Sequence, residues 1–420
     1  MKSYLKITFG ILWALLFVIG AIAFYERVTT GDTLTNLQSY VPWGLWVAAY
    51  IYFIGLSAGA FLLSSLAYGL GQKKLEPVGK YALFTALATL FMALLTIWSD
   101  IGHMPRAIEI FTRPQFHSMM AWMVWLYTSY FILLLAELFF AFRVDLPMWR
   151  STSSGFKRFF AKLISPSGVE PSANSQKRDK TILKTLALIG IPLAVAFHGG
   201  VGALFATVAA QEIWHNPLYP IIFLMGALAS GGAFLTALVV FFWPQKDASW
   251  KDLSVYLGRV TLGLILIDAL LTWSEYSIPL WYGVGDIREI QSLNAVLFGQ
   301  YWYVFWIFQV ALGLVASAAI LAAFPKRPKL IGFASALFAI TFFAVRLDIV
   351  IPAFVEPQLQ GLQSAYTDSR LTYSYLPSLF EWQLLLFVVT LGAAVLYLGY
   401  RYLPLTTPSE EQKVSLEART

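Results

Sequence analysis

Ionisable side chains lie at similar depths in several long apolar segments of the chain, where a charge is costly. An aspartate, a glutamate, an arginine and a second aspartate fall near one end of their segments, and a histidine lies somewhat deeper. Such a set could accept a proton on a carboxylate or imidazole and orient the charged form with a guanidinium. It could also pair only to hold helices together. The residues are Asp100, Glu275, Arg346, Asp348 and His198.

A second polar pattern runs along a single apolar segment. Ser254, Thr261, Asp268 and Glu275 recur every seven residues and share one helix face. They cover about 31 Å of helix at about 1.5 Å per residue. Together with Glu137, which is alone in the inner half of another segment, they form a candidate path for protons. The alternative is that they satisfy buried backbone groups or neighbouring helices.

Ten long apolar segments must position these residues. Each is long enough to cross a hydrocarbon core of about 30 Å as a helix. The mean hydropathy of +0.67 and the 12% of charged residues agree with this count. The sequence therefore predicts an all-α, polytopic membrane protein with about ten transmembrane helices. The segments are 7–25, 44–70, 81–99, 119–142, 184–210, 217–243, 254–280, 301–324, 330–352 and 380–402.

Lysine and arginine are distributed unevenly between the loops. With a cytoplasmic N-terminus, 23 of the 29 basic residues fall on the cytoplasmic side and six on the other. This bias predicts a multi-pass protein of a bacterial or archaeal cytoplasmic (inner) membrane, with both termini cytoplasmic. The net charge of +6 then suits anionic lipid and needs no nucleic acid partner. The first segment has features of a cleaved signal peptide, but its length favours an uncleaved helix.

An internal repeat organises the segments. SAGAFLLSSL at 57–66 matches SGGAFLTALV at 230–239, and the triplet at 98–100 has a counterpart at 273–275. Two parallel four-helix repeats, plus one extra helix at each end of the chain, explain the match. The expected parts are a first helix with an outer loop (1–43), a first repeat (44–210) containing a flexible cytoplasmic linker (143–183), a second repeat (217–352), an outer loop with the tenth helix (353–402) and a cytoplasmic tail (403–420).

The chain has no cysteine and only four histidines, of which His198 alone lies within an apolar segment. An iron–sulfur cluster and a thiolate metal site both need cysteine. A haem held by two histidines needs two imidazoles that face each other inside the bundle. The sequence therefore predicts no haem, no iron–sulfur cluster and no metal site in this chain.

Several motifs resemble those of one family. They are VPWGLWVAAYIYFIGLSAGAF in the second segment, WSD at the end of the third, RPQFHSMMAWMVWLY entering the fourth and YSYLPSLFEW entering the tenth. These motifs are similar to those of the NrfD/PsrC family, the membrane subunits of polysulfide-reductase-like complexes. The last motif resembles the ten-helix branch of that family. The resemblance covers nearly the whole chain.

The resemblance implies a cofactor-free subunit that exchanges electrons between the quinone pool, menaquinone or ubiquinone, and a ferredoxin-like [4Fe–4S] subunit on the outer face. Further redox subunits, a molybdopterin enzyme or a multihaem cytochrome c, would complete the complex. The outer loops 100–118 and 276–300 would form the docking face. Arg106, Arg113 and Glu381 are the expected partner-docking residues.

Carried over by position, Asp100 and His198 would lie next to the quinone and accept its protons. The expected pocket adds Trp98, Tyr50 and Trp122 as aromatic walls. Proton transfer would continue in the second half of the chain. Its expected path comprises Thr261, Asp268, Glu275, Arg346 and Asp348, with Glu137 from the first half.

A proton- or ion-coupled secondary transporter is the competing prediction, because a transporter would explain a repeat and buried charges without any partner. Two features count against it. The repeat is parallel, whereas many transporters use an inverted one. Helices broken by proline or glycine at matching mid-membrane positions are also missing from the pattern.

Overall fold

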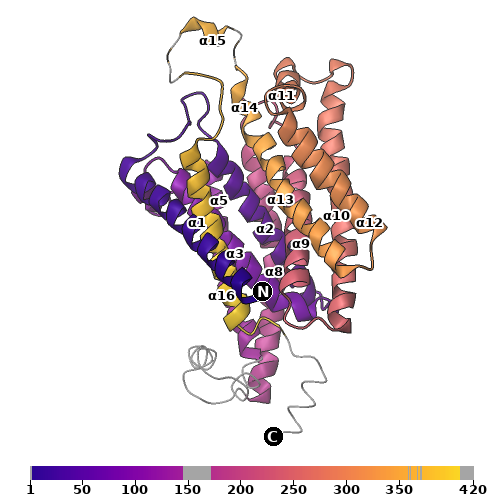
Figure 1. The fold of residues 1–420 in the computed structure, drawn as a ribbon. Helices are drawn as coiled ribbons and strands as arrows, with labels where there is room; N and C mark the ends of the chain where they lie inside the picture. The colour runs from indigo at the N-terminus through magenta and orange to yellow at the C-terminus, as the bar shows by residue number, and fades with distance from the viewer. Residues whose placement is uncertain are drawn as a thin grey trace.

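The computed structural model describes residues 2–144, 172–357, 359, 361–366, 368 and 371–406. Within these residues every regular element is a helix (Figure 1). Ten of the helical stretches are long and apolar enough to cross a membrane. The prediction of an all-α, polytopic membrane protein is confirmed.

The spanning helices follow one another with short helices in the loops between them. The first five are α1 (Lys2–Thr30), α2 (Leu45–Tyr68), α3 (Gly79–Asp100), α5 (Met119–Val144) and α8 (Ala173–Ala206). The next five are α9 (Tyr219–Phe242), α10 (Ala248–Leu280), the π-helix η4 (Val304–Ala316) continued by α12 (Ser317–Ala323), α13 (Pro328–Val350) and α16 (Leu379–Tyr402). The short helices are η1 (Glu76–Val78), η2 (Met104–Ile108), α4 (Glu109–Thr112), η3 (Trp281–Gly283), α11 (Ile287–Leu297), α14 (Pro352–Val355) and α15 (Leu362–Ala365).

Two helices extend well beyond the predicted apolar segments. Helix α1 continues to Thr30, past its apolar run. Helix α8 begins at Ala173, where the Ser172 hydroxyl accepts a hydrogen bond from the backbone N–H of Ser175 at 3.2 Å. Residues 173–183, which were expected to belong to the flexible linker, are therefore helical. The rest of the expected linker (145–171), Arg370 and most of the expected tail (407–420) lie outside the described residues.

Helices α2 and α9 form the centre of the molecule and contact each other closely. Glycine makes this approach possible, since a methyl group on Gly231 would lie 2.7 Å from the Cα of Gly59. Small residues at such a contact let two helix backbones pack without an intervening side chain. The glycines of the repeated motif therefore lie where its two copies meet.

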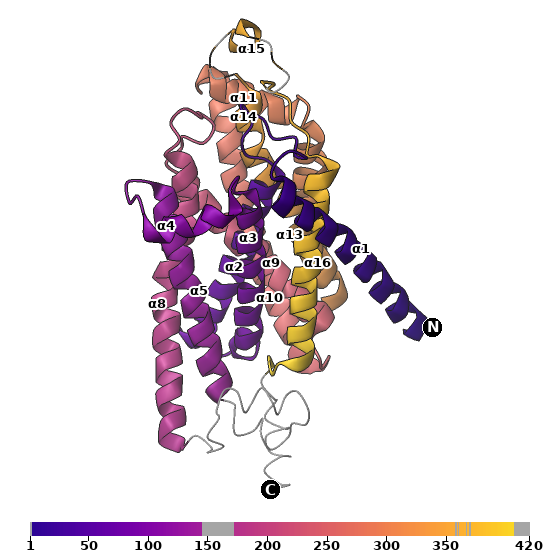
Figure 2. The same ribbon diagram turned by 90° about the vertical axis from the view of Figure 1, so that its left-hand side faces the viewer.

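The other helices surround this central pair in two groups. Helices α3 and α8 pack against α2, and α5 packs against α3 and α8. Helices α10 and α13 pack against α9, while η4 and α12 pack against α13. Helices α1 and α16 contact each other, and α16 also packs against α3. Figure 2 shows α1 leaning away from the other helices toward its N-terminus. The arrangement agrees with two four-helix units, although the repeat itself stays a prediction.

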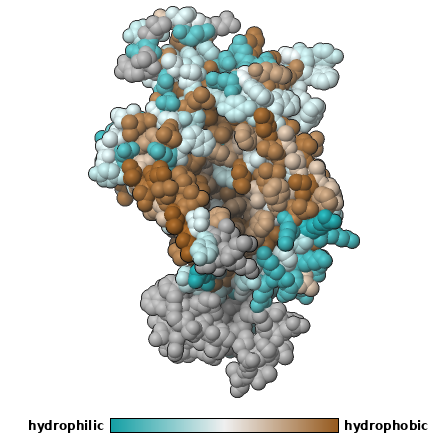
Figure 3. All heavy atoms as spheres, viewed as in Figure 1, coloured by the Kyte–Doolittle hydropathy of each residue, from teal (hydrophilic) through white to brown (hydrophobic). Residues whose placement is uncertain are grey.

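The two ends of the molecule differ in their loops. Most of the long loops, with α4, α11, α14 and α15, lie at the end drawn at the top of Figures 1 and 2, which we call the upper end. Short turns join α2 to α3, α9 to α10 and α12 to α13 at the lower end. Apolar side chains form a broad band between more polar ends on the face shown in Figure 3. Such a band is what a lipid-facing surface requires.

Candidate functional site

Arg27, near the upper end of α1, is almost fully buried against α3. Its Nε donates to the backbone oxygen of Ser99 at 2.8 Å, and its Nη2 donates to that of Ile101 at 2.9 Å. The same Nη2 lies 2.7 Å from a carboxylate oxygen of Asp32. The guanidinium also lies over the ring of Trp46, 5.7 Å from its centroid. These contacts fix a positive charge at the end of α3.

Glu381 lies at the start of α16, on the same side of the molecule. It completes a capping box, because its carboxylate accepts the backbone N–H of Ser378 at 2.8 Å while the Ser378 hydroxyl accepts the N–H of Glu381. The carboxylate also accepts a hydrogen bond from the Tyr375 hydroxyl. Burial and the neighbouring Glu381 raise the pKa of Tyr375 well above its usual value, so this hydroxyl stays protonated. Glu381 is only 1% exposed and cannot itself contact a docked partner.

Asp100, the last residue of α3, lies between these two groups. Its charge is within interaction range of Arg27, Asp32 and Glu381. One of its carboxylate oxygens is buried without a hydrogen-bond partner in the described part of the chain. Asp100 thus lies within charge-interaction range of one guanidinium and two other carboxylates, and its unpartnered oxygen is available to a proton. We call Arg27, Asp32, Asp100 and Glu381 the Arg27 cluster.

His198 does not join Asp100, although the two were predicted to share a pocket. His198 is fully buried on α8, its ring centroid 6.4 Å from that of Phe223 and within charge-interaction range of Arg346. Neither ring nitrogen has a side-chain partner among the described residues. The structure therefore divides the expected polar residues of the quinone pocket between two places.

The three aromatic residues predicted for the quinone pocket also lie in different places. Trp98 is partly exposed beside Phe24 of α1, and its indole N–H donates to the backbone oxygen of Met104 at 3.1 Å. Trp122 is 49% exposed on α5. Tyr50 is buried, and its hydroxyl is hydrogen-bonded to that of Tyr127. Of the predicted set, Trp98 is the residue nearest to Asp100 along α3.

Arg346 of α13 is the centre of a second group of buried polar residues. Its guanidinium lies between two rings, 4.7 Å from the centroid of Phe223 and 5.0 Å from that of Phe342. Its Nε and Nη2 have no hydrogen-bond partner within the described ranges. The carboxylates of Asp268 and Glu275, both on α10, are close enough to interact electrostatically with this guanidinium. We call Arg346, His198, Asp268 and Glu275 the Arg346 cluster.

A glycine of α9 makes room for this cluster. A methyl group on Gly226 would lie 3.0 Å from Nη2 of Arg346 and 3.4 Å from Oδ1 of Asp268. The guanidinium and the carboxylate therefore lie side by side against the α9 backbone. The Glu275 carboxylate is within hydrogen-bonding reach of the Tyr219 hydroxyl. Asp348 is buried nearby but faces Tyr276, and one of its carboxylate oxygens has no partner in the part of the chain that the structure describes.

A small cavity of about 20 Å³ separates α10 from η4 and α13. Asp268, Gln309 and Thr341 are among its walls, and the side-chain oxygen of Gln309 has no partner among the described residues. A cavity of this size with several polar walls can hold a water molecule. Gln309 lies on a π-helical stretch of 13 residues, an element that is rare and frequent at functional sites. Sequence reasoning missed Gln309, because nothing in an apolar run marks π-helical geometry.

Thr261 and Glu137 complete the residues predicted for the proton path. Two turns of α10 below Asp268, the Thr261 hydroxyl is 3.0 Å from that of Thr236 on α9. Glu137 lies apart in the first group of helices, fully buried, with both carboxylate oxygens unpartnered within the described residues. The structure thus brings together Asp268, Glu275 and Arg346, and leaves Glu137 in a different part of the molecule.

The upper surface carries the two remaining predicted docking residues. Arg106 in η2 and Arg113 after α4 are both exposed. They lie in the loop that leads from Asp100 to α5. Among the described residues, no group of three or more His, Asp or Glu is placed to hold a metal ion.

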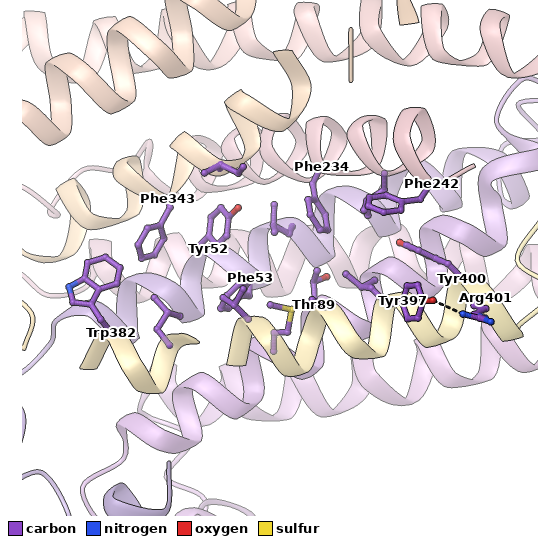
Figure 4. A pocket seen from close by; sticks show the side chains of 18 residues that line it. Tyr52, Phe53, Thr89, Phe234, Phe242, Phe343, Trp382, Tyr397, Tyr400 and Arg401 are labelled. Atoms are coloured by element: carbon purple, nitrogen blue, oxygen red, sulfur yellow. Dashed lines mark hydrogen bonds between the residues drawn. The ribbon is translucent and has the colours of Figure 1, made fainter. Parts of the chain in front are cut away.

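A long apolar groove of about 650 Å³ opens between the two groups of helices. One wall is formed by α16 with residues of α2 and α3, and the other by α9 and α13 (Figure 4). Aromatic rings line it from Trp382 and Phe343 at one end to Tyr397 and Tyr400 at the other. Neither Asp100 nor His198 lines this groove. Such a concave, apolar and aromatic surface is typical of sites for apolar molecules.

Comparisons with known proteins identify the relatives of the chain. Residues 33–358 match the family described as Polysulphide reductase, NrfD. A selenate reductase subunit of Mesobacillus selenatarsenatis is 36% identical over 370 residues, 87% of this chain and 86% of that protein. The Hdr-like menaquinol oxidoreductase integral membrane subunit of Archaeoglobus fulgidus is 28% identical, covering 92% and 91% of the two chains. The menaquinone reductase integral membrane subunit of Nitratidesulfovibrio vulgaris is 23% identical, covering 92% and 88%.

Proposed function

Because the chain belongs to the NrfD polysulphide reductase family, we propose that it is the integral membrane subunit of a respiratory oxidoreductase, exchanging electrons between the quinone pool and a redox partner. The observation that carries this proposal is the match to the family over most of the chain. Two relatives that match over most of their length are named as a menaquinol oxidoreductase subunit and a menaquinone reductase subunit. Menaquinone is accordingly the favoured quinone.

The residues at the upper end suit a quinone ring. Trp98, which is 40% exposed, offers aromatic surface near the end of α3 that carries Asp100. The bound quinol supplies two electrons and two protons. Asp100 accepts one of these protons on its unpartnered carboxylate oxygen, and the other proton passes to solvent at the upper end. Arg27, held by two backbone oxygens, keeps a compensating positive charge in place.

The electrons leave to a partner subunit, which we propose to be a ferredoxin-like protein with [4Fe–4S] clusters. The chain has no cysteine with which to hold such a cluster itself. The exposed Arg106 and Arg113 lie in the loop next to Asp100 and would meet an acidic partner surface. A molybdopterin enzyme or a multihaem cytochrome c would extend the chain of electron carriers.

We place the upper end on the outer side of the cytoplasmic membrane. The basic residues support this orientation, because those of the connections at the lower end outnumber those of the upper loops. Both termini are then cytoplasmic.

The Arg346 cluster is proposed to move protons in the second group of helices. Two carboxylates face one guanidinium there, and a buried negative charge without a partner is costly in a membrane. Taking up and releasing one proton at Asp268 relieves that imbalance. Water in the adjoining cavity, held by the side chains of Gln309 and Thr341, would carry the proton away from the carboxylate.

The comparisons give no support to a secondary transporter, since the relatives are membrane subunits of reductase complexes. Copurification separates the two functions. A tagged chain extracted gently from its native membrane should bring an iron–sulfur subunit whose clusters are visible by electron paramagnetic resonance. A chain that purifies alone while catalysing ion-coupled solute uptake in liposomes would overturn the proposal.

A further inference from the structure

We propose that the groove between the two groups of helices holds the long isoprenoid tail of the quinone. The inference rests on the proposed function, because it concerns the substrate of the same reaction. The groove follows one face of α16, whose lining residues recur every three or four positions from Trp382 to Arg401 (Figure 4). Figure 3 shows the same face of the molecule hollowed between the two apolar halves.

The length of the groove indicates a single long chain. Trp382 and Arg401 are 19 residues apart on one helix, which is about 29 Å at about 1.5 Å per residue. The hydrocarbon core of a bilayer is about 30 Å thick, so the acyl chains of one leaflet fill only about 15 Å. One phospholipid tail would therefore occupy only about half of the groove. A chain of repeated isoprene units can run through all of it.

The shape of the groove favours a slender ligand over a partner helix. Its volume of about 650 Å³ is spread over a length of about 29 Å. An α-helix with its side chains is about 10–12 Å across. A hydrocarbon chain is much thinner and can follow the whole groove.

The walls of the groove present almost no free polar group. The Tyr52 hydroxyl donates to the backbone oxygen of Ala339 at 2.8 Å, and that of Thr89 donates to the backbone oxygen of Thr85. The Tyr400 hydroxyl is hydrogen-bonded to that of Thr85, and the Tyr397 hydroxyl accepts from Arg401 at 2.6 Å. With its hydroxyls already paired, the groove offers methyl groups and ring faces to its ligand. A hydrocarbon is the chemistry that such walls recognise.

The two ends of the groove set the direction of the tail. The upper end, at Trp382 and Phe343, lies one residue along α16 from Glu381 of the Arg27 cluster. The lower end carries Arg401, the one charged side chain among the described residues that line the groove. The ring of the quinone therefore lies toward the upper end, where the proposed proton acceptor is, and the tail descends toward Arg401.

A matched pair of substitutions on α16 tests this assignment in the intact complex. Ala393 lines the middle of the groove, so Ala393→Phe blocks it. Leu398 is 51% exposed on the same helix but does not line the groove, so Leu398→Phe is the control. Turnover is measured with a native long-tailed menaquinol in proteoliposomes and with a short-tailed soluble quinol analogue.

We expect the Ala393→Phe complex to lose most of its turnover with the long-tailed quinol and to keep its turnover with the short-tailed quinol. The Leu398→Phe complex should keep its turnover with both quinols. Should Ala393→Phe fail to assemble, Val389→Phe blocks the groove at another level. An unchanged ratio of the two activities in an assembled blocking variant overturns the inference and leaves the proposed function intact. A wild-type complex that oxidises neither quinol contradicts the proposed function instead.

Bound molecules give an independent readout. Native mass spectrometry of the wild-type complex should show a quinone that the Ala393→Phe complex lacks. If Ala393→Phe instead removes a phospholipid and leaves the bound quinone in place, the groove is a lipid site near Arg401 and the inference is wrong.

Discussion

Asp100 keeps one buried carboxylate oxygen without a partner among the described residues, although Arg27 lies close by with its Nε and Nη2 engaged elsewhere. Replacing Asp100 by asparagine removes the proton acceptor but preserves volume and hydrogen-bonding capacity. We expect quinol-dependent electron transfer to fall by about 100-fold, a usual contribution of a proton-transfer group, with assembly unchanged. Steady-state oxidation of a soluble quinol by the purified complex measures this effect.

Asp32 supplies the control for that experiment. It also belongs to the Arg27 cluster, and it forms an ion pair with Arg27 at 2.7 Å, but it is 44% exposed to solvent. Water can replace the contacts of a side chain that is 44% exposed, and asparagine keeps a hydrogen-bond acceptor for Arg27, so Asp32→Asn should retain most of the activity. Equal losses in the two variants would show that the net charge of the cluster, rather than the Asp100 carboxylate, controls the reaction.

Asp268 lies beside Arg346 and a cavity large enough for water. If it carries protons, Asp268→Asn should abolish charge translocation across proteoliposomes while quinol oxidation continues. The measurement is the ratio of protons moved to electrons transferred. An Asp268→Asn complex with an unchanged ratio, or one that only loses thermal stability, would assign the residue a structural role.

Tyr375 ties the loop before α16 to the start of α2. Its hydroxyl donates to Glu381 and accepts the backbone N–H of Leu45 at 2.9 Å. Tyr375→Phe leaves the Glu381 carboxylate and the backbone N–H of Leu45 each without this partner. We expect the free energy of unfolding to fall by about 1–3 kcal/mol. Because burial and Glu381 raise the pKa of Tyr375, its contribution to stability should be complete below about pH 10, the usual pKa of tyrosine, and should decline as the pH rises above that value.

Thermal unfolding of the purified protein as a function of pH measures both effects. Tyr373→Phe is the matched control. Tyr373 lies in the same loop as Tyr375, and its ring stacks on that of Tyr40. A Tyr375→Phe protein as stable as the Tyr373→Phe protein would contradict the role given to the Glu381 hydrogen bond.

Among the helices, the contact of α2 with α9 depends on adjacent glycines with different surroundings. A methyl group on Gly231 would lie 2.7 Å from the Cα of Gly59 and from the backbone oxygen of Leu56, whereas one on Gly232 would first meet a Leu264 side-chain carbon at 3.5 Å. Gly231→Ala should therefore destabilise the protein by about 1–3 kcal/mol. Gly232→Ala should be neutral or slightly stabilising, because alanine favours a helix. Thermal unfolding that ranks the two variants in the opposite order would contradict this packing.

Helices could be predicted well from the sequence because a membrane imposes long, continuous apolar runs. Helix ends outside such runs could not be predicted. One example is Ala173, where α8 begins in a polar stretch capped by Ser172. The π-helical geometry of η4 was equally hidden, since it changes hydrogen bonding without changing composition.

The position of a residue along its helix was also easier to predict than its lateral neighbours. Asp100 lies at the end of α3 and His198 lies within α8, as their positions in the apolar runs suggested, but the order of the helices around the bundle separates them. Asp100 faces α1 and α16, while His198 faces α9 and α13. Arg27 was missed because the first apolar run was expected to stop before it. The reason for the burial of Arg27 is visible only in the structure, where backbone oxygens at the end of α3 accept its hydrogen bonds.

For the molecule as a whole, the proposed orientation can be tested directly because the chain has no native cysteine. Ser364 of α15 and Lys326 are exposed at opposite ends. In intact cells, a membrane-impermeant maleimide should label a Ser364→Cys protein and should label a Lys326→Cys protein only after permeabilisation. The reverse pattern would place the upper end in the cytoplasm.

We propose that electrons pass from a quinol, through a site on this subunit, to an iron–sulfur partner. This transfer can be observed by adding menaquinol to the oxidised, purified complex and following the clusters of the partner by electron paramagnetic resonance. We expect rapid cluster reduction in the wild-type complex and little in the assembled Asp100→Asn complex. Cluster reduction at the wild-type rate in the Asp100→Asn complex, or none in either complex, would contradict the proposal.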